Sequence, residues 1–302
     1  MELEWEKIRA LGQGGVGRVY LCEEKRTGKQ YAIKEVQKTS SRIARLEAEK
    51  EALGSSLHSS FENDDMVYLV MEYFSGEPLY KVLWRNGRFP SAFAKQCAAQ
   101  LVLAVTDLHS RGFMHRDIKT GNFLLDPDGK CHLIDFGFAK AIDKTSASSK
   151  ALTLCGTHYT MAPEVFRRLG HSCEVDWWAV GVFIFEMLCG SPPWPYKCDD
   201  SDLQSYFNRI EETSKELDVD SLIDDKDACD LISRLLTLDP TARLDGSGVK
   251  SHPWFCGVDW ENPVHLSTTD LEPLPAITLP TPPPNDSAES ITSAENALFE
   301  GF

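Results

Sequence analysis

The 302-residue sequence lacks the features that mark membrane and secreted proteins. It has no run of eighteen apolar residues, so no membrane-spanning helix is expected. The first residues lack the basic and apolar segments of a signal peptide, and Met1 is not followed by the glycine that N-myristoylation requires. The nine cysteines are an odd number and form no Cys-x-x-Cys pair, which predicts reduced thiols in the cytoplasm or the nucleus.

Basic residues are also scarce, because 31 Lys and Arg stand against 46 Asp and Glu and give a net charge of −15. This balance disfavours nucleic acids and anionic membranes as partners and suits a basic peptide. The hydrophobic content of 42% and the charged content of 25% are those of a globular protein. A chain of this length can form one large domain or two of medium size.

Most of the candidate catalytic and metal-binding residues lie between Phe113 and Gly137. They include the run His115-Arg116-Asp117-Ile118-Lys119-Thr120-Gly121-Asn122, and a short β-type run then leads to Asp135-Phe136-Gly137. Asp117 can orient a hydroxyl and accept its proton, while Lys119 can neutralise charge on a transferred phosphoryl group. Asn122 and Asp135 offer the oxygen ligands that Mg²⁺ takes beside phosphate oxygens. The pattern therefore predicts a phosphoryl-transfer site on loops beside short strands.

A glycine-rich segment opens the antiparallel sheet that we expect over residues 8–36. Gly12, Gly14 and Gly17 would let backbone N–H groups approach a triphosphate, although a glycine-rich hairpin turn explains their spacing equally well. A strand is expected after these glycines, whereas a Rossmann dinucleotide site would have a helix there. This difference argues against a dinucleotide site. Lys34 on the next strand favours phosphate binding.

Residues 40–53 are expected to form a helix, with Ser40 or Ser41 as the N-cap and with Ile43, Leu46 and Leu53 on its apolar face. Asp176 begins a second apolar helix that continues through residue 188, which predicts a helix buried all round. Residues 261–296 combine most of the late prolines with Ser, Thr and acidic residues, and should lack a core of their own.

Residues 8–255 resemble a eukaryotic serine/threonine protein kinase domain of the AGC group, most similar to the cyclic-nucleotide-dependent kinases. The resemblance rests on residues 115–122, which correspond to the catalytic loop of the family, and on the segments 14–19, 135–140, 153–157, 162–164 and 190–194. It implies an α+β bilobal fold. An N-lobe over residues 8–73 would hold a small antiparallel sheet and one main helix. A mainly helical C-lobe would span residues 74–255, and an AGC-type tail residues 256–302.

The resemblance also assigns roles to individual residues. Asp117, Lys119 and Thr157 would be catalytic, and Asn122 and Asp135 would bind Mg²⁺. Among the candidates Glu47, Glu49 and Glu51, the pattern Glu-Lys-x-x-Leu selects Glu49 as the partner of Lys34. The residues assigned to ATP are Leu11, Gly12, Gly14, Gly17, Val19, Ala32, Lys34, Glu49, Met71, Glu72, Phe74 and Leu124.

Further implied roles concern regulation and structure. Thr153 is the candidate activating phosphosite, with Arg116, Lys140 and Arg45 as cationic partners of its phosphate, although it could be a plain loop threonine. Thr157 would hydrogen-bond to Asp117 and Lys119. Three further roles complete the set: Asp176 would cap backbone N–H groups of the catalytic loop, Arg243 would pair with Glu164, and Phe299 and Phe302 would dock the tail on the small lobe.

The sequence departs from the family pattern at several positions. About two helical turns of the connection after the residue 40–53 helix are missing, so that helix must end early. Gly121 and Pro78 stand where substrate-reading acids are expected, which leaves Glu77 and Glu186 as candidates. The tail lacks an Asn-Phe-Asp segment.

These observations leave more than one functional class. We expect an ATP-dependent serine/threonine protein kinase that acts on protein substrates as a monomeric catalytic chain. A regulatory subunit or an upstream activating kinase would be a separate partner, because no cyclic-nucleotide-binding domain is present. The alternative is a catalytically impaired kinase-like scaffold, in which the short connection displaces Glu49 from Lys34. A small-molecule kinase is disfavoured by Ala162-Pro163-Glu164.

Overall fold

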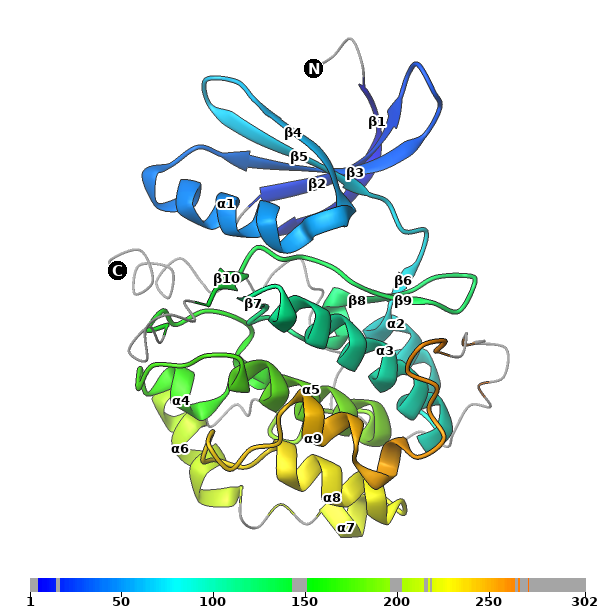
Figure 1. Cartoon of the computed structure of the whole chain (residues 1–302), viewed down its shortest axis with the longest axis vertical. Helices are drawn as coiled ribbons and strands as arrows, with labels where there is room; N and C mark the ends of the chain where they lie inside the picture. The colour runs from blue at the N-terminus through cyan, green and yellow to red at the C-terminus, as the bar shows by residue number, and fades with distance from the viewer. Residues whose placement is uncertain are drawn as a thin grey trace. The chain divides into compact units, whose positions relative to one another are not determined.

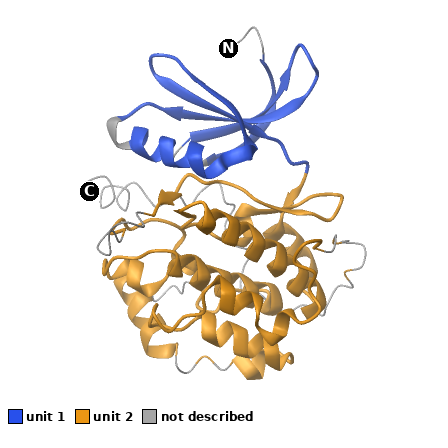
Figure 2. Ribbon diagram, viewed as in Figure 1, with its two compact units in different colours: residues 1–75, 283–302 blue, residues 76–282 orange. Residues whose placement is uncertain are grey.

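The computed structural model describes residues 5–14, 17–142, 151–195, 203–214, 217, 219–263, 266 and 271. The chain divides into two units (Figures 1 and 2). Unit 1 comprises residues 1–75 with 283–302, and unit 2 comprises residues 76–282. No helix in the described ranges is both long enough and apolar enough to cross a membrane.

Unit 1 is built on an antiparallel sheet of five strands in the order β1-β2-β3-β5-β4 (Figure 1). Val19, Lys34 and Leu69 lie directly opposite one another on β2, β3 and β5. Apolar residues of β3 and β5 form the buried layer, for example Ile33 at 2% and Val70 at 0% exposure. The strands are β1 Trp5–Gly14, β2 Gly17–Glu24, β3 Gln30–Gln37, β4 Leu57–Glu62 and β5 Met66–Glu72.

The helix of unit 1, α1 Ser40–Leu53, has the predicted bounds but not the predicted N-cap or apolar face. Its N-cap is Thr39, whose backbone carbonyl accepts the N–H groups of the third and fourth helical residues. Ile43 is 50% exposed, whereas Leu46 and Leu53 are buried. The buried face is centred on Glu49. Because successive helical residues are roughly 100° apart, Ile43, six positions earlier, lies about 120° from that centre and faces solvent.

The connection from α1 to the sheet is one 3₁₀ turn, η1 Gly54–Ser56, and β4 begins at the next residue. Gly54 has φ of 53°, which favours glycine, and its carbonyl accepts the backbone N–H of Leu57. The helix therefore runs over its full predicted length to Leu53, and the expected early end of the helix does not occur. Strand β4 was not predicted, because the polar run in Leu57-His58-Ser59-Ser60-Phe61 obscures a strand that pairs on one side with β5.

Unit 2 is mainly helical and is organised around α5 Glu174–Cys189, which is buried from Val175 to Cys189 as predicted. Helices α3 and α8 pack against it (Figure 1). Its other helices are α2 Leu79–Asn86, α3 Ser91–Ser110, α4 Pro163–Phe166, α6 Leu203–Thr213, α7 Val219–Leu222, α8 Lys226–Leu235 and α9 Gly246–Lys250. Its short strands are β6 Glu77–Pro78, β7 Phe113–Met114, β8 Phe123–Leu125, β9 Cys131–Leu133 and β10 Lys140–Ala141, and its 3₁₀ turns are η2 Thr120–Asn122, η3 His158–Thr160 and η4 Pro253–Phe255.

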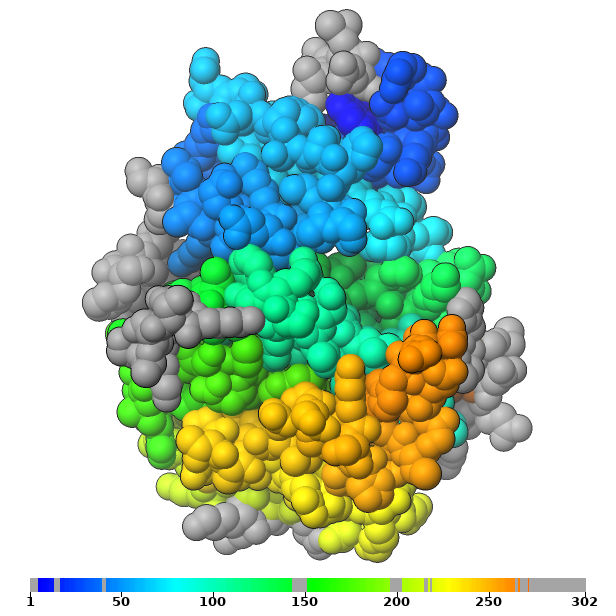
Figure 3. Space-filling view, viewed as in Figure 1, coloured from blue at the N-terminus to red at the C-terminus, as the bar shows by residue number. Residues whose placement is uncertain are grey.

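Part of the chain after the last helix packs on unit 2. The residues around η4 up to residue 263, orange in Figure 3, lie at the surface, where η4 contacts α3. Leu266 and Leu271 are 9% and 7% exposed and are buried in the core of unit 2, so these two residues pack against another part of the chain and form no core of their own. The Leu266 N–H donates to the Gly129 carbonyl at 2.8 Å. This contact needs glycine, because a Cβ at Gly129 would lie 1.9 Å from the Leu266 carbonyl oxygen.

Replacing Gly129 by Ala should release Leu266 from unit 2. Gly28→Ala is the matched control, because Gly28 and Gly129 have φ of 71° and 81°, but a Cβ at Gly28 meets nothing within 4 Å. The left-handed backbone should cost each variant roughly 1–2 kcal/mol of unfolding free energy. Only Gly129→Ala should also accelerate hydrogen exchange at the Leu266 amide. Equal exchange at that amide in both variants would contradict the proposed fit.

Candidate active site

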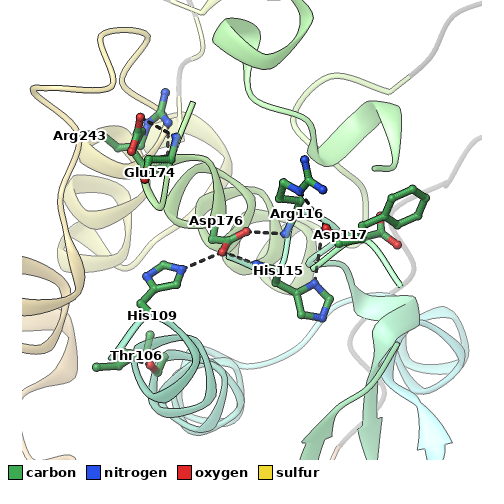
Figure 4. A network of polar contacts seen from close by, with 11 residues as sticks. Thr106, His109, His115, Arg116, Asp117, Glu174, Asp176 and Arg243 are labelled. Carbon is green, nitrogen blue, oxygen red and sulfur yellow. Dashed lines mark hydrogen bonds and ion pairs between the residues drawn. The ribbon is translucent and has the colours of Figure 1, made fainter. Parts of the chain in front are cut away.

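A single buried carboxylate, that of Asp176, organises the start of the catalytic loop (Figure 4). One oxygen accepts the backbone N–H of His115 at 2.8 Å and the other accepts that of Arg116 at 2.8 Å. Nε2 of His109, from α3, lies 2.7 Å from the same carboxylate. The predicted cap by Asp176 is confirmed. It fixes Arg116 in a left-handed backbone conformation, with φ of 67°.

The Asp117 carboxylate is held on several sides within unit 2. Thr157 donates to its Oδ1 from the backbone N–H at 3.0 Å and from Oγ1 at 2.7 Å. Nδ2 of Asn122 donates to its Oδ2 at 2.8 Å, and Lys119 Nζ lies 3.6 Å from that oxygen. Lys119 also donates to Thr157 Oγ1 at 3.0 Å. The predicted contacts of Thr157 with Asp117 and Lys119 are therefore confirmed, and they hold a carboxylate that is only 4% exposed.

Glycine permits the close approach of the two segments that form this cluster. Gly156 has φ of 103°, and a Cβ there would lie 2.4 Å from the Arg116 carbonyl oxygen. Any other residue would push Thr157 away from Asp117. The spacing in Cys155-Gly156-Thr157 is thus a structural requirement of the site.

Asn122 and Asp135 lie close together and suit a hard cation. Asn122 uses its Nδ2 to donate to the Asp117 carbonyl at 2.9 Å as well as to the carboxylate, which leaves its Oδ1 for a cation. The Ile134 N–H donates to the Asn122 carbonyl at 2.9 Å, which places Asp135 next to it. Asp135 is exposed, with φ of 59°. Two oxygen donors of this kind fit Mg²⁺ that also binds phosphate, and no cluster of three His, Cys, Asp or Glu suited to a metal occurs in the described ranges.

Unit 1 contains a buried ion pair between Lys34 on β3 and Glu49 on α1. Their Nζ and Oε1 atoms are 2.6 Å apart, and the residues are 5% and 2% exposed. Glu47 instead pairs with Lys50 at 2.9 Å on the exposed side of the helix. The choice of Glu49 is confirmed, and the short connection after α1 does not separate it from Lys34.

The other residues predicted for ATP fall at defined places. Gly12 and Val19 lie opposite each other on β1 and β2, and Val19 lies opposite Lys34. A Cβ at Gly17 would lie 2.3 Å from the Glu35 carbonyl oxygen, which explains that glycine by packing alone. Ala32 pairs with Met71 across β3 and β5. The remaining residues are Leu11 and Gly14 in β1, Glu72 at the end of β5, Phe74 just beyond it, and Leu124 in β8 of unit 2.

Two of the three cationic residues predicted for a Thr153 phosphate lie in the same unit as Thr153. Arg116 and Lys140 belong to the same unit as Thr153, whereas Arg45 belongs to α1 of unit 1. Arg116 donates from Nε to the Phe138 carbonyl at 2.8 Å, and its buried Nη1 has no hydrogen-bond partner among the described residues. Burial and the Arg116 charge lower the pKa of Lys140. The phosphosite role of Thr153 stays a prediction.

Sequence analysis missed His171, which no motif marks. It is 0% exposed, and in the part of the chain that the structure describes neither ring nitrogen has a hydrogen-bond partner. Its backbone pairs with Ala151, two residues before Thr153. Burial, reinforced by the charges of Arg116 and Lys140, lowers the pKa of His171 to about 4, so the ring is neutral near pH 7.

The two predicted substrate carboxylates are engaged within unit 2. Arg85 on α2 donates to both oxygens of Glu77 at 2.6 Å, and these hydrogen bonds lower the Glu77 pKa. Glu186 is 9% exposed and accepts from Thr120 Oγ1 at 3.2 Å. Phe299 and Phe302, the predicted docking residues, lie outside the described residues.

The predicted structural ion pair of unit 2 is confirmed. Arg243 donates from Nη1 and Nη2 to the two carboxylate oxygens of Glu164 at 2.6 and 3.1 Å. The residues are 6% and 4% exposed. A buried pair of this geometry is costly to break, because removal of one partner leaves an uncompensated charge.

Comparison with known proteins agrees with this geometry. The family described as the protein kinase domain matches residues 5–255. The chain is 37% identical over 274 residues to the cAMP-dependent protein kinase catalytic subunit of Dictyostelium discoideum. The aligned region covers 85% of this chain and 40% of that protein. It is 36% identical over 281 residues to the mouse (Mus musculus) cAMP-dependent protein kinase catalytic subunit PRKX. Here the aligned region covers 86% of this chain and 74% of the relative. Protein kinase 3 of Dictyostelium discoideum is 34% identical over 85% of this chain and 30% of its own length.

The chain therefore belongs to the protein kinase family, with a serine/threonine kinase domain of the AGC type. Kinase domains require ATP and a divalent metal ion. The chain spans less than half of the length of two of these relatives, at 40% and 30%.

The pH dependence of stability should reveal the His109–Asp176 interaction. Burial lowers the pKa of His109, but hydrogen bonds to Asp176 and Cys173 outweigh it and raise the pKa from 6.5 to about 9. Because the folded pKa is the higher one, the stabilisation is fully present below pH 6.5 and is lost as the pH rises through 9. The loss should amount to at most about 3 kcal/mol.

Urea unfolding of the wild type and of His109→Gln at pH 6 and near pH 9.5 measures this loss. The wild type should lose more unfolding free energy than the variant over that range. Equal losses of unfolding free energy in the two proteins would show that a protonated His109 does not stabilise the Asp176 carboxylate.

Proposed function

We propose that this chain transfers the γ-phosphoryl group of ATP to Ser or Thr hydroxyls of protein substrates. The observation that carries the proposal is the Asp117 cluster, in which a buried carboxylate is fixed by Thr157 and Asn122 beside the Lys119 ammonium. A carboxylate that is held in place, and is not fully neutralised, can both orient a hydroxyl and take its proton.

The proposed reaction assigns one task to each group. The substrate hydroxyl oxygen forms a bond to the γ-phosphorus, the bond from that phosphorus to the ADP oxygen breaks, and Asp117 accepts the hydroxyl proton. Lys119 neutralises charge on the transferred group. Asn122 and Asp135 would hold Mg²⁺, which when bound supplies positive charge to phosphate oxygens.

Unit 1 would contribute nucleotide binding. Lys34 would bind phosphate oxygens, and Glu49 holds its ammonium in place at 2.6 Å. The glycines at the β1–β2 turn would leave backbone N–H groups accessible to phosphate. These roles rest on the resemblance together with the observed ion pair.

The alternative, a kinase-like scaffold, loses its main support. It depended on the short α1–β4 connection displacing Glu49, and the Lys34–Glu49 pair is intact. Asp117, Asn122 and Asp135 are also present, and the relatives named above are protein kinases. We therefore favour the enzyme.

Several finer features belong to the same proposal. Phosphorylation of Thr153 would activate the chain by recruiting Arg116 and Lys140. An upstream kinase or a regulatory subunit would be a separate partner, and substrates would be basic because the chain carries a net charge of −15. The described cysteines are free thiols, which supports a location in the cytoplasm or the nucleus.

Replacing Asp117 by Asn tests the proposed function. Asn keeps the size of the side chain but cannot accept the proton, so kcat should fall by about 10²–10⁴. The measurement is Mg·ATP-dependent phosphotransfer to a pool of basic Ser/Thr peptides, with ATP binding measured in parallel. Asp128→Asn, in an exposed turn of unit 2, is the control and should retain full activity. Undiminished transfer by Asp117→Asn would sink the assignment.

A further inference from the structure

A pocket on unit 2 lies outside the predicted catalytic and nucleotide-binding residues. Its volume is about 350 Å³. Its walls come from α4 and the residues after it, from α6, and from the segment that follows α8; α4 and α6 lie side by side in Figure 1. The lining residues are Pro163, Glu164, Arg167, Leu169, Gly170, Glu211, Leu238, Asp239 and Pro240.

One carboxylate of this pocket, that of Asp239, forms no ion pair with the described residues, although Thr241 hydrogen bonds and the more distant Arg243 charge lower its pKa. Glu164 is neutralised by Arg243, and Glu211 forms an ion pair with Arg167. Asp239 accepts from the Thr241 N–H at 2.9 Å and from Thr241 Oγ1 at 2.7 Å, both on Oδ1. In the described part of the chain no cationic group lies within 4.0 Å of the Asp239 carboxylate. Its Oδ2 is thus available to a cationic ligand.

An apolar side chain is presented beside this carboxylate. Leu169 is 65% exposed, the highest value among the large hydrophobic side chains that the structure describes. Its neighbours Arg168 and Gly170 have φ of 53° and 81°, and this turn follows directly on α4. A non-glycine residue in this conformation is uncommon, so the backbone holds Leu169 outward at a cost. Pro163, Leu238 and Pro240 extend the apolar surface of the pocket.

We propose that this pocket binds a lysine or arginine side chain of a partner protein, presented on an extended segment with a neighbouring apolar residue. The long stem of either side chain would lie against Leu169 and Leu238, and its charged end would reach Asp239. A volume of about 350 Å³ suits one or two side chains, because it lies near the lower limit for ligand pockets. The net charge of −15 would favour the approach of a basic partner.

Direct binding of peptides to the full chain tests this proposal without any use of its enzymatic activity. The probes are fluorescein-labelled, acetylated heptapeptide pools that contain no Ser, Thr or Tyr and therefore cannot be phosphorylated. One pool has Arg at the centre, one has Lys and one has Gln, each between two leucines. Fluorescence polarisation should show binding of the Arg and Lys pools, weakened by salt, and at least tenfold weaker binding of the Gln pool.

Two variants locate the site, each with a matched control elsewhere on unit 2. Asp239→Asn keeps the oxygen that Thr241 uses and removes the charge; Asp259→Asn is its control, because Asp259 accepts backbone N–H groups at 3.0 and 3.1 Å in a similar exposed turn. Leu169→Ser removes the apolar contact, and Leu222→Ser is its control at 51% exposure. Asp239→Asn and Leu169→Ser should each weaken binding about tenfold, and the controls should bind normally.

Other results would overturn the proposal. Equal binding by all four variants would place the peptides elsewhere, for example at the substrate site of the kinase. Absence of binding at millimolar concentration would exclude this class of ligand. Sedimentation that shows self-association abolished by Leu169→Ser would instead assign the surface to a second copy of the chain.

Discussion

The Asp176 carboxylate is the interaction on which the site of unit 2 depends. It is fully buried at the start of a helix without exposed faces, where an uncompensated charge would be very costly. Burial alone would raise the pKa of Asp176, but the His109 interaction and the loop N–H groups outweigh it and keep the carboxyl ionised. The same bonds hold His115 and Arg116, so the charge that the fold must stabilise also fixes the residues before Asp117.

In unit 1 the comparable constraint is the pair Lys34–Glu49, with both groups buried. The ion pair fixes which face of α1 meets the sheet, and therefore leaves Ile43 in solvent. A single 3₁₀ turn then suffices to reach β4, because Gly54 adopts a left-handed φ of 53°. The connection of one 3₁₀ turn therefore leaves the Lys34–Glu49 pair intact.

The sequence predicted the features that depend on short spacings. His115 to Asn122 and Asp135 to Gly137 carry their chemistry locally. The bounds of α1 and the burial of α5 followed from their apolar patterns, and the contacts of Asp176 and Thr157 were implied by the resemblance to protein kinases. Features set by tertiary packing were not predictable in this way. Strand β4 is polar because it lies at a sheet edge, the Leu266 contact depends on a missing Cβ at Gly129, and His171 is defined by neighbours distant in sequence.

The most direct test of this account is a comparison of kcat and ATP affinity for the wild type and Asp176→Asn. The two Asp176 oxygens interact with His109 Nε2 and with the backbone N–H groups of His115 and Arg116. An Asn side chain has only one oxygen, so one of the two loop N–H groups loses its acceptor. We predict that kcat falls by about 100-fold through displacement of Asp117, while nucleotide affinity and overall folding stay near those of the wild type. An unchanged kcat in the folded variant would contradict the claim that this carboxylate positions the catalytic loop.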